Sequence, residues 1–372
     1  MQFRFALHTE IEFGCGKLKK LGDICQAHGW TNGILVCDPM FIDSGLADQV
    51  LGYADGNLCG VFSDITPNPT VESVDACARL IEEKNARFIA AMGGGSSMDC
   101  AKAASVVAFS GHDARFYHSG LGAIDHAGIP IIAIPTTAGT GSEVTNVAVL
   151  SDGERGVKAP MASDHMFAKV ALVDPELTRT VPPQVVASTG LDVLSHALEG
   201  YWSVNHQPVC DAVAIYAAKL AFENLYRAYQ DGNDMEAKED MSLASLMAGI
   251  AFGQPKTAAS HACSFPLTNL YHLPHGEACA FTLDALLRLN CETDGERLET
   301  FAKMVGFPNV DAMADAIHSL KVNMGMRYTL AQAGIADEDV PMLARLCRHP
   351  NLDNNPTKMS QERLVEMFLA MR

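Results

Sequence analysis

The stretch that decides the fold is Arg87–Ala104, RFIAAMGGGSSMDCAKAA, in which a β-rich run leads through three glycines into a helix-forming segment. Glycines leave no Cβ where the strand turns into the helix, so backbone N–H groups and the positive helix end can approach a diphosphate. The G-x-G-x-x-G fingerprint is not met, because Met98 stands where the third glycine would be. Alone, the stretch fits an ordinary tight turn equally well, with Asp99 as a first-turn carboxylate and Lys102 as its neutralising partner.

Around this stretch, short β-rich runs alternate with amphipathic segments, which is typical of a parallel, doubly wound α/β sheet. The expected strands are residues 33–38, 58–64, 87–92, 129–134 and 170–173, with a hairpin over 146–151 and 157–163. The helices expected between the strands are residues 16–29, 69–84 and 96–110. Helical periodicity then takes over, in segments 184–203, 208–229, 235–252, 277–291, 294–305, 310–325, 338–348 and 359–371. We therefore predict an α/β dinucleotide-binding domain over residues 1–180 and an all-α domain over 181–372.

The composition excludes several classes of function. Lys and Arg number 27 against 44 Asp and Glu, a net charge of −17 that repels phosphate backbones, so nucleic acid is not an expected partner. No apolar run reaches the roughly 18 residues of a membrane helix, and the first residues do not resemble a signal peptide. The eleven scattered cysteines include no C-x-x-C pair, which indicates free thiols. We expect a cytoplasmic protein without membrane association.

A second loop with small and hydroxyl-bearing residues, Pro135–Glu143 (PTTAGTGSE), follows the strand expected at 129–134. Loops at the carboxyl ends of parallel strands face one crevice, where open α/β sheets bind ligands. Asp38 ends another strand, and its carboxylate would accept hydrogen bonds from an adenosine ribose while repelling a 2′-phosphate, which favours NAD over NADP. An Asp at a strand end is also a common turn or cap residue.

A candidate metal site lies in the helical half. Asp192 and His196 are four residues apart, which places both on one face of a helix, and His261 and His275 follow in later helical segments. One Asp and three His would suit Fe²⁺ or Zn²⁺. Each histidine could equally be a core or surface imidazole, and the Asp–His pair also has a helix-stabilising interpretation.

Three neighbouring residues complicate the choice of ligands. His272 is an alternative to His275, and the residues alone do not separate the two. Cys263 and Cys279 are soft donors close by in the sequence, but we interpret both as buried small hydrophobic residues.

Taken together, these segments resemble the iron-containing (group III) alcohol dehydrogenase family over essentially the full length of the chain. The matching motifs are Pro67–Thr70, Gly93–Lys102, Pro135–Glu143, Asp174–Thr178, Gly190 through His196, and His261 through Gly276. The resemblance implies a dehydroquinate synthase-like fold, with NAD(P) on the first domain, metal on the second and a cleft between them. It also implies reversible hydride transfer between NAD(H) and a small alcohol or aldehyde, with Fe²⁺ or alternatively Zn²⁺ as metal, in a homodimer.

The resemblance also assigns site residues. It implies metal ligands at Asp192, His196, His261 and His275, and thereby chooses His275 over His272. The expected cofactor contacts, with Asp99 added from the glycine-rich turn, are Asp38, Asn68, Gly94, Gly95, Ser96, Asp99, Thr136, Thr137, Thr140, Thr145 and Lys158. Without the family comparison, Lys158 would be interpreted as a solvated hairpin lysine.

One position departs from the family pattern. Many members carry a further histidine four residues after the third ligand, where this chain has Phe265, so another group or water must carry the proton. The segment 256–268 is more similar to a phosphonoacetaldehyde-reductase-like branch. Lys256, five residues before His261, is our candidate to bind an anionic group on the substrate, against the alternative of a surface lysine at a helix start.

Two other functions remain open at this stage. One is a non-redox enzyme of the dehydroquinate-synthase type that uses NAD transiently, although Asp192 precedes His196 at helical spacing as in the dehydrogenases. The other is a catalytically inactive, metal-binding homologue, which only Phe265 favours.

Overall fold

The computed structural model describes residues 2–372, which form two compact units. The α/β unit comprises Ala6–Thr137 and Ser142–Thr178. The helical unit comprises Arg179–Arg372, the residues up to Phe5, and the short segment Ala138–Gly141. Ala138–Gly141 thus group with the helices, although they lie within the span predicted for the α/β domain.

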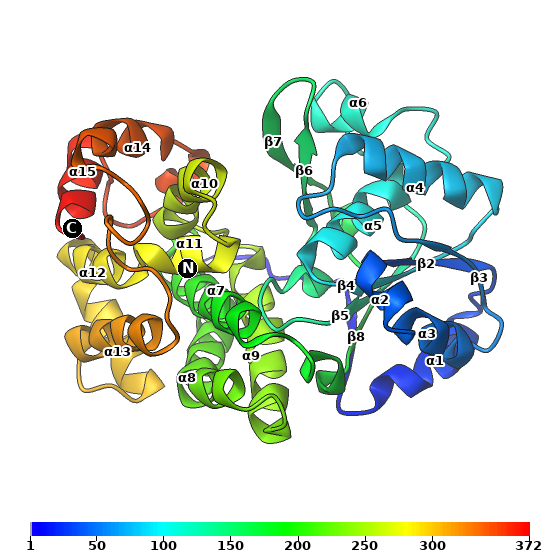
Figure 1. Ribbon diagram of the computed structural model, residues 1–372, viewed down its shortest axis with the longest axis horizontal. Helices are drawn as coiled ribbons and strands as arrows, with labels where there is room; N and C mark the ends of the chain where they lie inside the picture. Colours follow the sequence, from blue (N-terminus) through cyan, green and yellow to red (C-terminus); the bar gives the residue numbers. More distant parts are fainter. Residues whose placement is uncertain (1) are drawn as a thin grey trace. The chain divides into compact units, whose positions relative to one another are not determined.

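The α/β unit is built on a parallel sheet, as the alternating pattern predicts (Figure 1). Among residues 2–372 this sheet has six strands, in the order β1 (Glu10–Phe13), β8 (Val170–Val173), β5 (Ile131–Pro135), β4 (Ile89–Gly93), β2 (Gly33–Cys37) and β3 (Leu58–Phe62). Every adjacent pair is parallel. The predicted hairpin is also present, as β6 (Val147–Asp152) paired antiparallel with β7 (Val157–Ala162).

Both faces of this sheet are covered by helices. Because successive side chains along a strand point to opposite faces, neighbouring residues belong to two different hydrophobic cores. Ile34 and Ile89 belong to one hydrophobic core, together with residues of α4 (Val71–Glu83) and α5 (Gly95–Val107). Leu35, Ala90 and Ile132 belong to the opposite core, with residues of α1 (Leu21–His28) and α3 (Leu46–Tyr53). The shorter helices of this unit are α2 (Pro39–Asp43) and α6 (Ala114–His118).

The helical unit packs around α7, which is buried along most of its length. Its helices are α7 (Pro183–Trp202), α8 (Pro208–Gln230), α9 (Met235–Gly253), α10 (Ala259–Tyr271), α11 (His275–Phe281), α12 (Leu283–Val305), α13 (Val310–Asn323), α14 (Val340–Leu346) and α15 (Gln361–Leu369). Glycines on α7 allow close approach: a Cβ on Gly190 would lie 2.1 Å from Leu225 Cδ1 on α8, and one on Gly200 would lie 2.9 Å from the Ala251 backbone on α9. α7 therefore lies at the packed centre of this unit.

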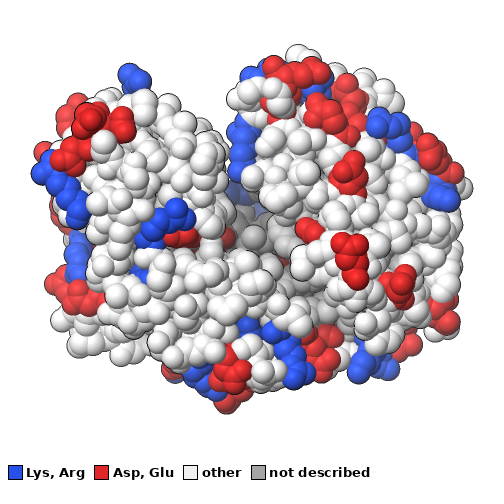
Figure 2. All heavy atoms as spheres, in the orientation of Figure 1, with Lys and Arg blue, Asp and Glu red and all other residues white. Residues whose placement is uncertain are grey.

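The distribution of charge, the length of the helices and the state of the cysteines also bear on function. On the face shown in Figure 2, acidic and basic side chains are interspersed, so the net charge of −17 is not gathered into one acidic patch there. Within residues 2–372, no helix is long and apolar enough to cross a membrane, and no disulfide joins any of the cysteines.

Candidate functional site

The glycine-rich turn lies beside Thr136 and Thr137, which begin the second predicted loop, in the α/β unit. β4 ends at Gly93, whose φ of +151° and close approach to Ser97 leave no room for a Cβ. The N-cap of α5 is Gly94, which offers no capping side chain, so the first N–H groups of this helix are the donors that a diphosphate would take. Thr136 N donates to Gly93 O at 3.0 Å, and a Cβ built on Gly94 would contact Thr137 Oγ1 at 3.5 Å.

Two further predicted cofactor contacts meet at the start of α5. The N–H of Asn68 donates to Ser96 Oγ at 3.2 Å, and Lys158 Nζ donates to Asn68 Oδ1 at 2.6 Å. Lys158 is therefore not a solvated hairpin lysine: β7 carries it to the same end of the sheet as the glycine-rich turn. A cation beside this turn would complement the phosphate charge.

Asp99 and Lys102 do more than neutralise one another on a helix surface. Lys102 is fully buried and donates to Ser142 Oγ at 2.8 Å, Thr145 Oγ1 at 3.2 Å and Val147 O at 3.1 Å. Ser142 Oγ in turn donates to Asp99 Oδ1 at 3.0 Å. These contacts tie α5 to the chain after β5 and position the predicted cofactor contact Thr145.

The same network shifts three pKa values. Burial lowers the pKa of Lys102 to about 8, against the opposing charges of Asp99 and Glu143. Burial raises the pKa of Glu143 to about 7, and it also raises the pKa of Asp99, with Lys102 pulling the other way. The α/β unit thus holds titratable groups whose charge changes near neutral pH.

The remaining predicted cofactor residues are placed as follows. Asp38 lies at the carboxyl end of β2, next to β4, and its side chain accepts a hydrogen bond from Met40 N at 3.0 Å as the N-cap of α2. Gly95 opens α5. Thr140 belongs to the helical unit, in the segment Ala138–Gly141.

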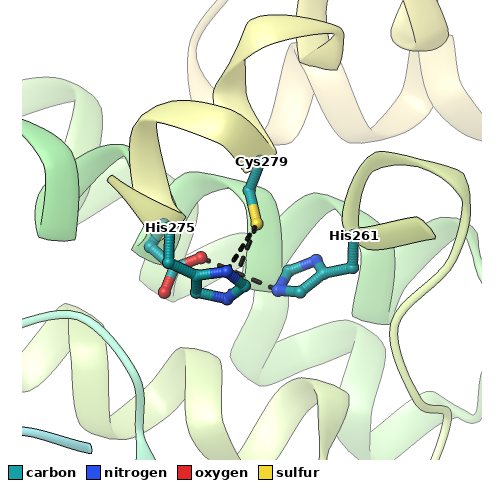
Figure 3. Close-up of side chains that lie close together, drawn as sticks. His261, His275 and Cys279 are labelled. Carbon is teal, nitrogen blue, oxygen red and sulfur yellow. Dashed lines mark hydrogen bonds and ion pairs between the residues drawn. The ribbon is translucent and has the colours of Figure 1, made fainter. Parts of the chain in front are cut away.

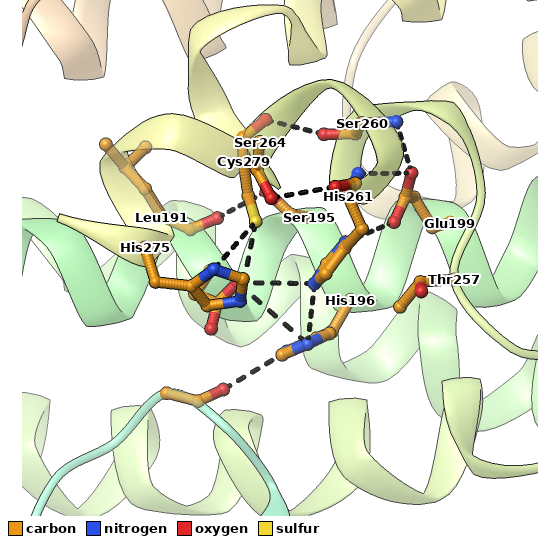
Figure 4. A network of polar contacts seen from close by, with 12 residues as sticks. Leu191, Ser195, His196, Glu199, Thr257, Ser260, His261, Ser264, His275 and Cys279 are labelled. Atoms are coloured by element: carbon orange, nitrogen blue, oxygen red, sulfur yellow. Dashed lines mark hydrogen bonds and ion pairs between the residues drawn. The ribbon is translucent and has the colours of Figure 1, made fainter. Parts of the chain in front are cut away.

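In the helical unit, α7 presents Asp192, His196 and Glu199 at i, i+4 and i+7, which is one helix face. His196 Nε2 lies 3.9 Å from Asp192 Oδ1 and 3.1 Å from His261 Nε2 on α10. His261 Nε2 lies 3.7 Å from the same carboxylate oxygen. Three of the four predicted ligands therefore bring donor atoms to one buried point. Figure 4 shows the two imidazole rings of this group, His196 and His261, close together.

Hydrogen bonds orient both rings so that Nε2 is the inward atom. The Nδ1–H of His196 donates to Gly139 O at 3.2 Å, in the segment Ala138–Gly141. The Nδ1–H of His261 donates to Glu199 Oε2, whose other oxygen accepts from Ser260 N at 2.6 Å and from His261 N at 3.2 Å. An imidazole that donates through one nitrogen keeps a lone pair on the other, which is the arrangement of metal-ligating histidines.

The fourth predicted ligand reaches the site because α11 packs tightly on α7. A Cβ on Gly276 would lie 2.0 Å from Ser188 O and 2.9 Å from Asp192 Cβ, so only glycine permits this approach. The preceding residue, His275, joins the donor group (Figure 3). His272 does not: it is the left-handed C-cap of α10, with φ 54°, and its ring nitrogens are not part of the donor group, although both histidines are exposed.

Sequence reasoning missed one member of the group. Donor atoms of Asp192, His261, His275 and Cys279 all lie within 4.8 Å of one another, and Cys279 was interpreted only as a buried small residue. Cys279 is indeed buried, but its Sγ lies 3.7 Å from His275 Nε2. The spacing of His275 and Cys279 by one helical turn is the signal that could have indicated it.

The chemistry of the site fits a divalent metal ion. Among the described residues, Asp192 Oδ1 is a buried polar atom without a hydrogen-bond partner, which is costly unless a cation neutralises it. Burial raises the pKa of Asp192 to about 6, and burial with repulsion from His261 and His275 holds the pKa of His196 well below its usual value. Carboxylate and imidazole donors converging on one point suit Fe²⁺ or Zn²⁺.

The position of the expected family histidine is occupied as the sequence indicates. Phe265 follows His261 by one turn of α10, and its ring contacts the ring of His349 with centroids 4.6 Å apart. His349 Nδ1 accepts from Asn351 N at 3.2 Å, so the neutral ring carries its proton on Nε2. Nothing in the sequence connected His349 with this region.

Comparison with known proteins decides the family. The family model described as "Iron-containing alcohol dehydrogenase" matches residues 8–175. The model described as "Fe-containing alcohol dehydrogenase family, C-terminal" matches residues 186–371. The chain belongs to the iron-containing alcohol dehydrogenase family. It is an alcohol dehydrogenase or aldehyde reductase that uses a nicotinamide dinucleotide.

Individual relatives agree with this assignment. The chain is 48% identical to a sulfoacetaldehyde reductase from Bifidobacterium kashiwanohense solved in complex with NAD⁺, with TM-score 0.97 and coverage of 100% of this chain and 99% of that one. It is 32% identical to alcohol dehydrogenase 4 of Saccharomyces cerevisiae (strain YJM789), over 96% of this chain and 95% of the yeast protein. It is also 32% identical to 1,3-propanediol dehydrogenase of Klebsiella pneumoniae, over 96% and 95% respectively.

Proposed function

We propose that this iron-containing alcohol dehydrogenase homologue is an NADH-dependent reductase of short aldehydes that carry an anionic group such as a sulfonate or phosphonate. The observation that carries the proposal is the 48% identity, over the whole chain, to a sulfoacetaldehyde reductase. Sulfoacetaldehyde and phosphonoacetaldehyde share one chemistry, a two-carbon aldehyde with a tetrahedral anion. The resemblance of segment 256–268 to the phosphonoacetaldehyde-reductase-like branch points to the same substrates.

The α/β unit supplies the binding of the dinucleotide. Its donors are the first N–H groups of α5 at Gly95 and Ser96, the hydroxyls of Thr136 and Thr137, and Lys158. Asp38 at the end of β2 supports NADH over NADPH, because its carboxylate would repel a 2′-phosphate while accepting bonds from a free ribose diol.

The helical unit supplies the metal ligands, which we assign to Asp192, His196, His261 and His275. A divalent ion bound there would supply Lewis acidity toward the substrate oxygen. Glu199 and Gly139 hold the rings of His261 and His196 in the required tautomers. Phe252 stacks on His196 with centroids 4.1 Å apart, which fixes that ring and excludes water from one side of it.

We assign the binding site for the anionic group of the substrate to Lys256 and its neighbouring residues. Lys256 is exposed and has φ 68°, a left-handed conformation that costs a side-chain-bearing residue about 1 kcal/mol relative to glycine. Its N–H donates to Phe252 O at 2.7 Å, and Phe252 is the residue that stacks on His196. The ammonium group of Lys256 donates to Gly253 O at 2.8 Å, at the end of α9. The left-handed conformation of Lys256, directly after the helix that carries Phe252, supports a role for this ammonium group.

The segment after Lys256 is held by a second polar loop. Asn351 Nδ2 donates to Thr257 Oγ1 and Asn354 Nδ2 donates to Thr257 O, both at 2.8 Å. The same loop begins at His349, which contacts Phe265. Because Phe265 cannot exchange a proton, we assign proton transfer to His349 or to water on this side of the site.

The test is NADH consumption with matched aldehydes. Sulfoacetaldehyde and phosphonoacetaldehyde should be reduced with a far higher kcat/KM than the neutral analogue in which a tert-butyl group replaces the sulfonate. Lys256→Met should lose this discrimination, whereas the exposed Lys303→Met on α12 should keep it. If Lys256→Met lowers kcat/KM equally for charged and neutral aldehydes, Lys256 does not bind the anionic group.

The other functions considered from the sequence are less well supported. The relatives reported above are named as dehydrogenases and reductases, which favours net redox chemistry over a transient use of NAD and over an inactive homologue. Assembly as a homodimer and a cytoplasmic location stay predictions.

A further inference from the structure

We infer that Cys279 takes the place of His196 as the fourth donor of the metal centre when the bound ion is Zn²⁺, and that its thiolate makes the site prefer Zn²⁺ over Fe²⁺. The inference rests on the proposed metal site in the helical unit. It goes beyond that site because Cys279 is not among the four ligands that the family resemblance implies.

The position of the sulfur carries the first step. Sγ of Cys279 lies 3.7 Å from Nε2 and 3.9 Å from Nδ1 of His275. Nearly equal distances to both ring nitrogens are not those of one directed hydrogen bond. Figure 3 shows the sulfur pointing from α11 toward the space between the rings of His275 and His261.

A packing role alone does not account for this position. A buried cysteine that only fills space would have apolar neighbours, whereas the Cys279 thiol is grouped with donor atoms of Asp192, His261 and His275 within 4.8 Å. One of these neighbours, Asp192, is 2% exposed, and its Oδ1 has no hydrogen-bond partner among residues 2–372. A cation held by these donors would neutralise the Asp192 carboxylate, which a purely apolar packing role for Cys279 would not.

Two overlapping donor sets result. Asp192, His261 and His275 are common to both, and the fourth donor is either His196 or Cys279. The set with His196 has three nitrogens and one oxygen, which suits Fe²⁺ as well as Zn²⁺. The set with Cys279 contains a soft sulfur donor, which suits Zn²⁺ better than Fe²⁺.

Metal binding by Cys279 changes two bonds and involves no oxidation or reduction. When Cys279 binds the ion, the S–H bond breaks, a sulfur–metal bond forms and the proton leaves to solvent, with no change in the oxidation state of the metal. The preference for Zn²⁺ therefore needs no co-reactant.

The experiment uses Co²⁺ as a spectroscopic probe in the full-length, metal-free protein. Wild-type protein with one bound equivalent of Co²⁺ should show a thiolate-to-cobalt charge-transfer band in the near ultraviolet. Cys279→Ser should lose the band, and its ratio of Zn²⁺ to Fe²⁺ affinity should fall by about tenfold or more. Cys210→Ser is the matched control, because Cys210 is equally buried but lies on α8 and contacts Ile250 O, and it should change neither result.

The outcomes separate this inference from the proposal on which it rests. One equivalent of Co²⁺ bound to wild-type protein without a charge-transfer band would overturn the role of Cys279 and leave the metal site standing. Failure of the wild-type protein to bind any Co²⁺, Zn²⁺ or Fe²⁺ would overturn both. The wild-type spectrum alone decides the matter if Cys279→Ser does not fold.

Discussion

The Nδ1–H of His261 donates to the carboxylate of Glu199, a fully buried residue on the same face of α7 as Asp192 and His196. This pairing turns Nε2 of His261 toward Asp192 Oδ1, 3.7 Å away. The carboxylate also accepts the N–H of Ser260, so it holds both the ring and the first turn of α10. Glu199 is therefore a positioning residue for the metal centre.

Replacing Glu199 should weaken metal binding without removing a ligand. We expect Glu199→Gln to lower the affinity for Zn²⁺ or Fe²⁺ by about 10- to 100-fold, because the amide no longer stabilises the required tautomer as a charged acceptor does. Competition with a chelator measures this directly. The exposed Glu296→Gln on α12 is the control, and equal affinities in both variants would contradict the assignment.

The close packing of α11 on α7 should depend on Gly276, which has no side chain at the contact. In Gly276→Ala the new Cβ would lie 2.0 Å from Ser188 O. We therefore expect the free energy of unfolding to fall by about 1–3 kcal/mol and metal binding to weaken. Gly295→Ala on α12 has open space around its Cβ and should leave both quantities nearly unchanged. Denaturant titration and metal competition on the two variants provide the measurement.

The choice of dinucleotide should depend on the charge of Asp38. Asp38→Ser keeps an acceptor for Met40 N, and therefore the N-cap of α2, but removes the carboxylate. We expect the KM for NADPH to fall on the order of tenfold as the like-charge repulsion disappears. If steady-state kinetics show the same ratio of NADH to NADPH use in wild type and variant, Asp38 does not set the preference.

The buried carboxyl of Glu143 should make stability depend on pH. Its pKa in the folded chain is about 7 against a reference value of 4.5, so the native state holds the proton more tightly and stability falls as pH rises from 4.5 to about 7. Asp192 and Asp99 also have raised pKa values, so Glu143→Gln should reduce this slope rather than remove it. The variant should be more stable than wild type at pH 8, by up to about 3 kcal/mol.

The control for this prediction is the exposed Glu83→Gln on α4. It should retain the wild-type slope in thermal denaturation between pH 4.5 and 7. A Glu143→Gln variant whose loss of stability over that range is as steep as in wild type would show that other groups cause the effect.

Much of the fold followed from local patterns, and the exceptions have physical reasons. Strands buried on both faces, such as β4 and β5, appear as continuous apolar runs and were predicted. β1 was not, because Glu10–Phe13 is a short edge strand with two carboxylates. The helices expected at 277–291 and 294–305 begin and end elsewhere: α11 stops at Phe281, and α12 runs on through a kink at Asp294.

The candidate site was predictable where spacing along one helix defines it and not where the tertiary structure does. The pair Asp192 and His196 follows from helical spacing alone. Glu199, Cys279 and His349 gain their positions only when α10, α11 and the loop before Asn351 pack against other elements, and a single sequence does not show those contacts. The choice between His272 and His275 needed the family resemblance, and the left-handed C-cap at His272 explains why that side chain is elsewhere.

The most direct measurement of the central claim is anomalous diffraction at the absorption edge of the metal, from crystals of protein loaded with one equivalent of Zn²⁺ or Fe²⁺. We predict a single strong peak about 2.0–2.3 Å from a carboxylate oxygen of Asp192 and from Nε2 of His261, with His275 bound to the same ion. A peak at His272 or elsewhere on the surface, with none among these side chains, would contradict the account.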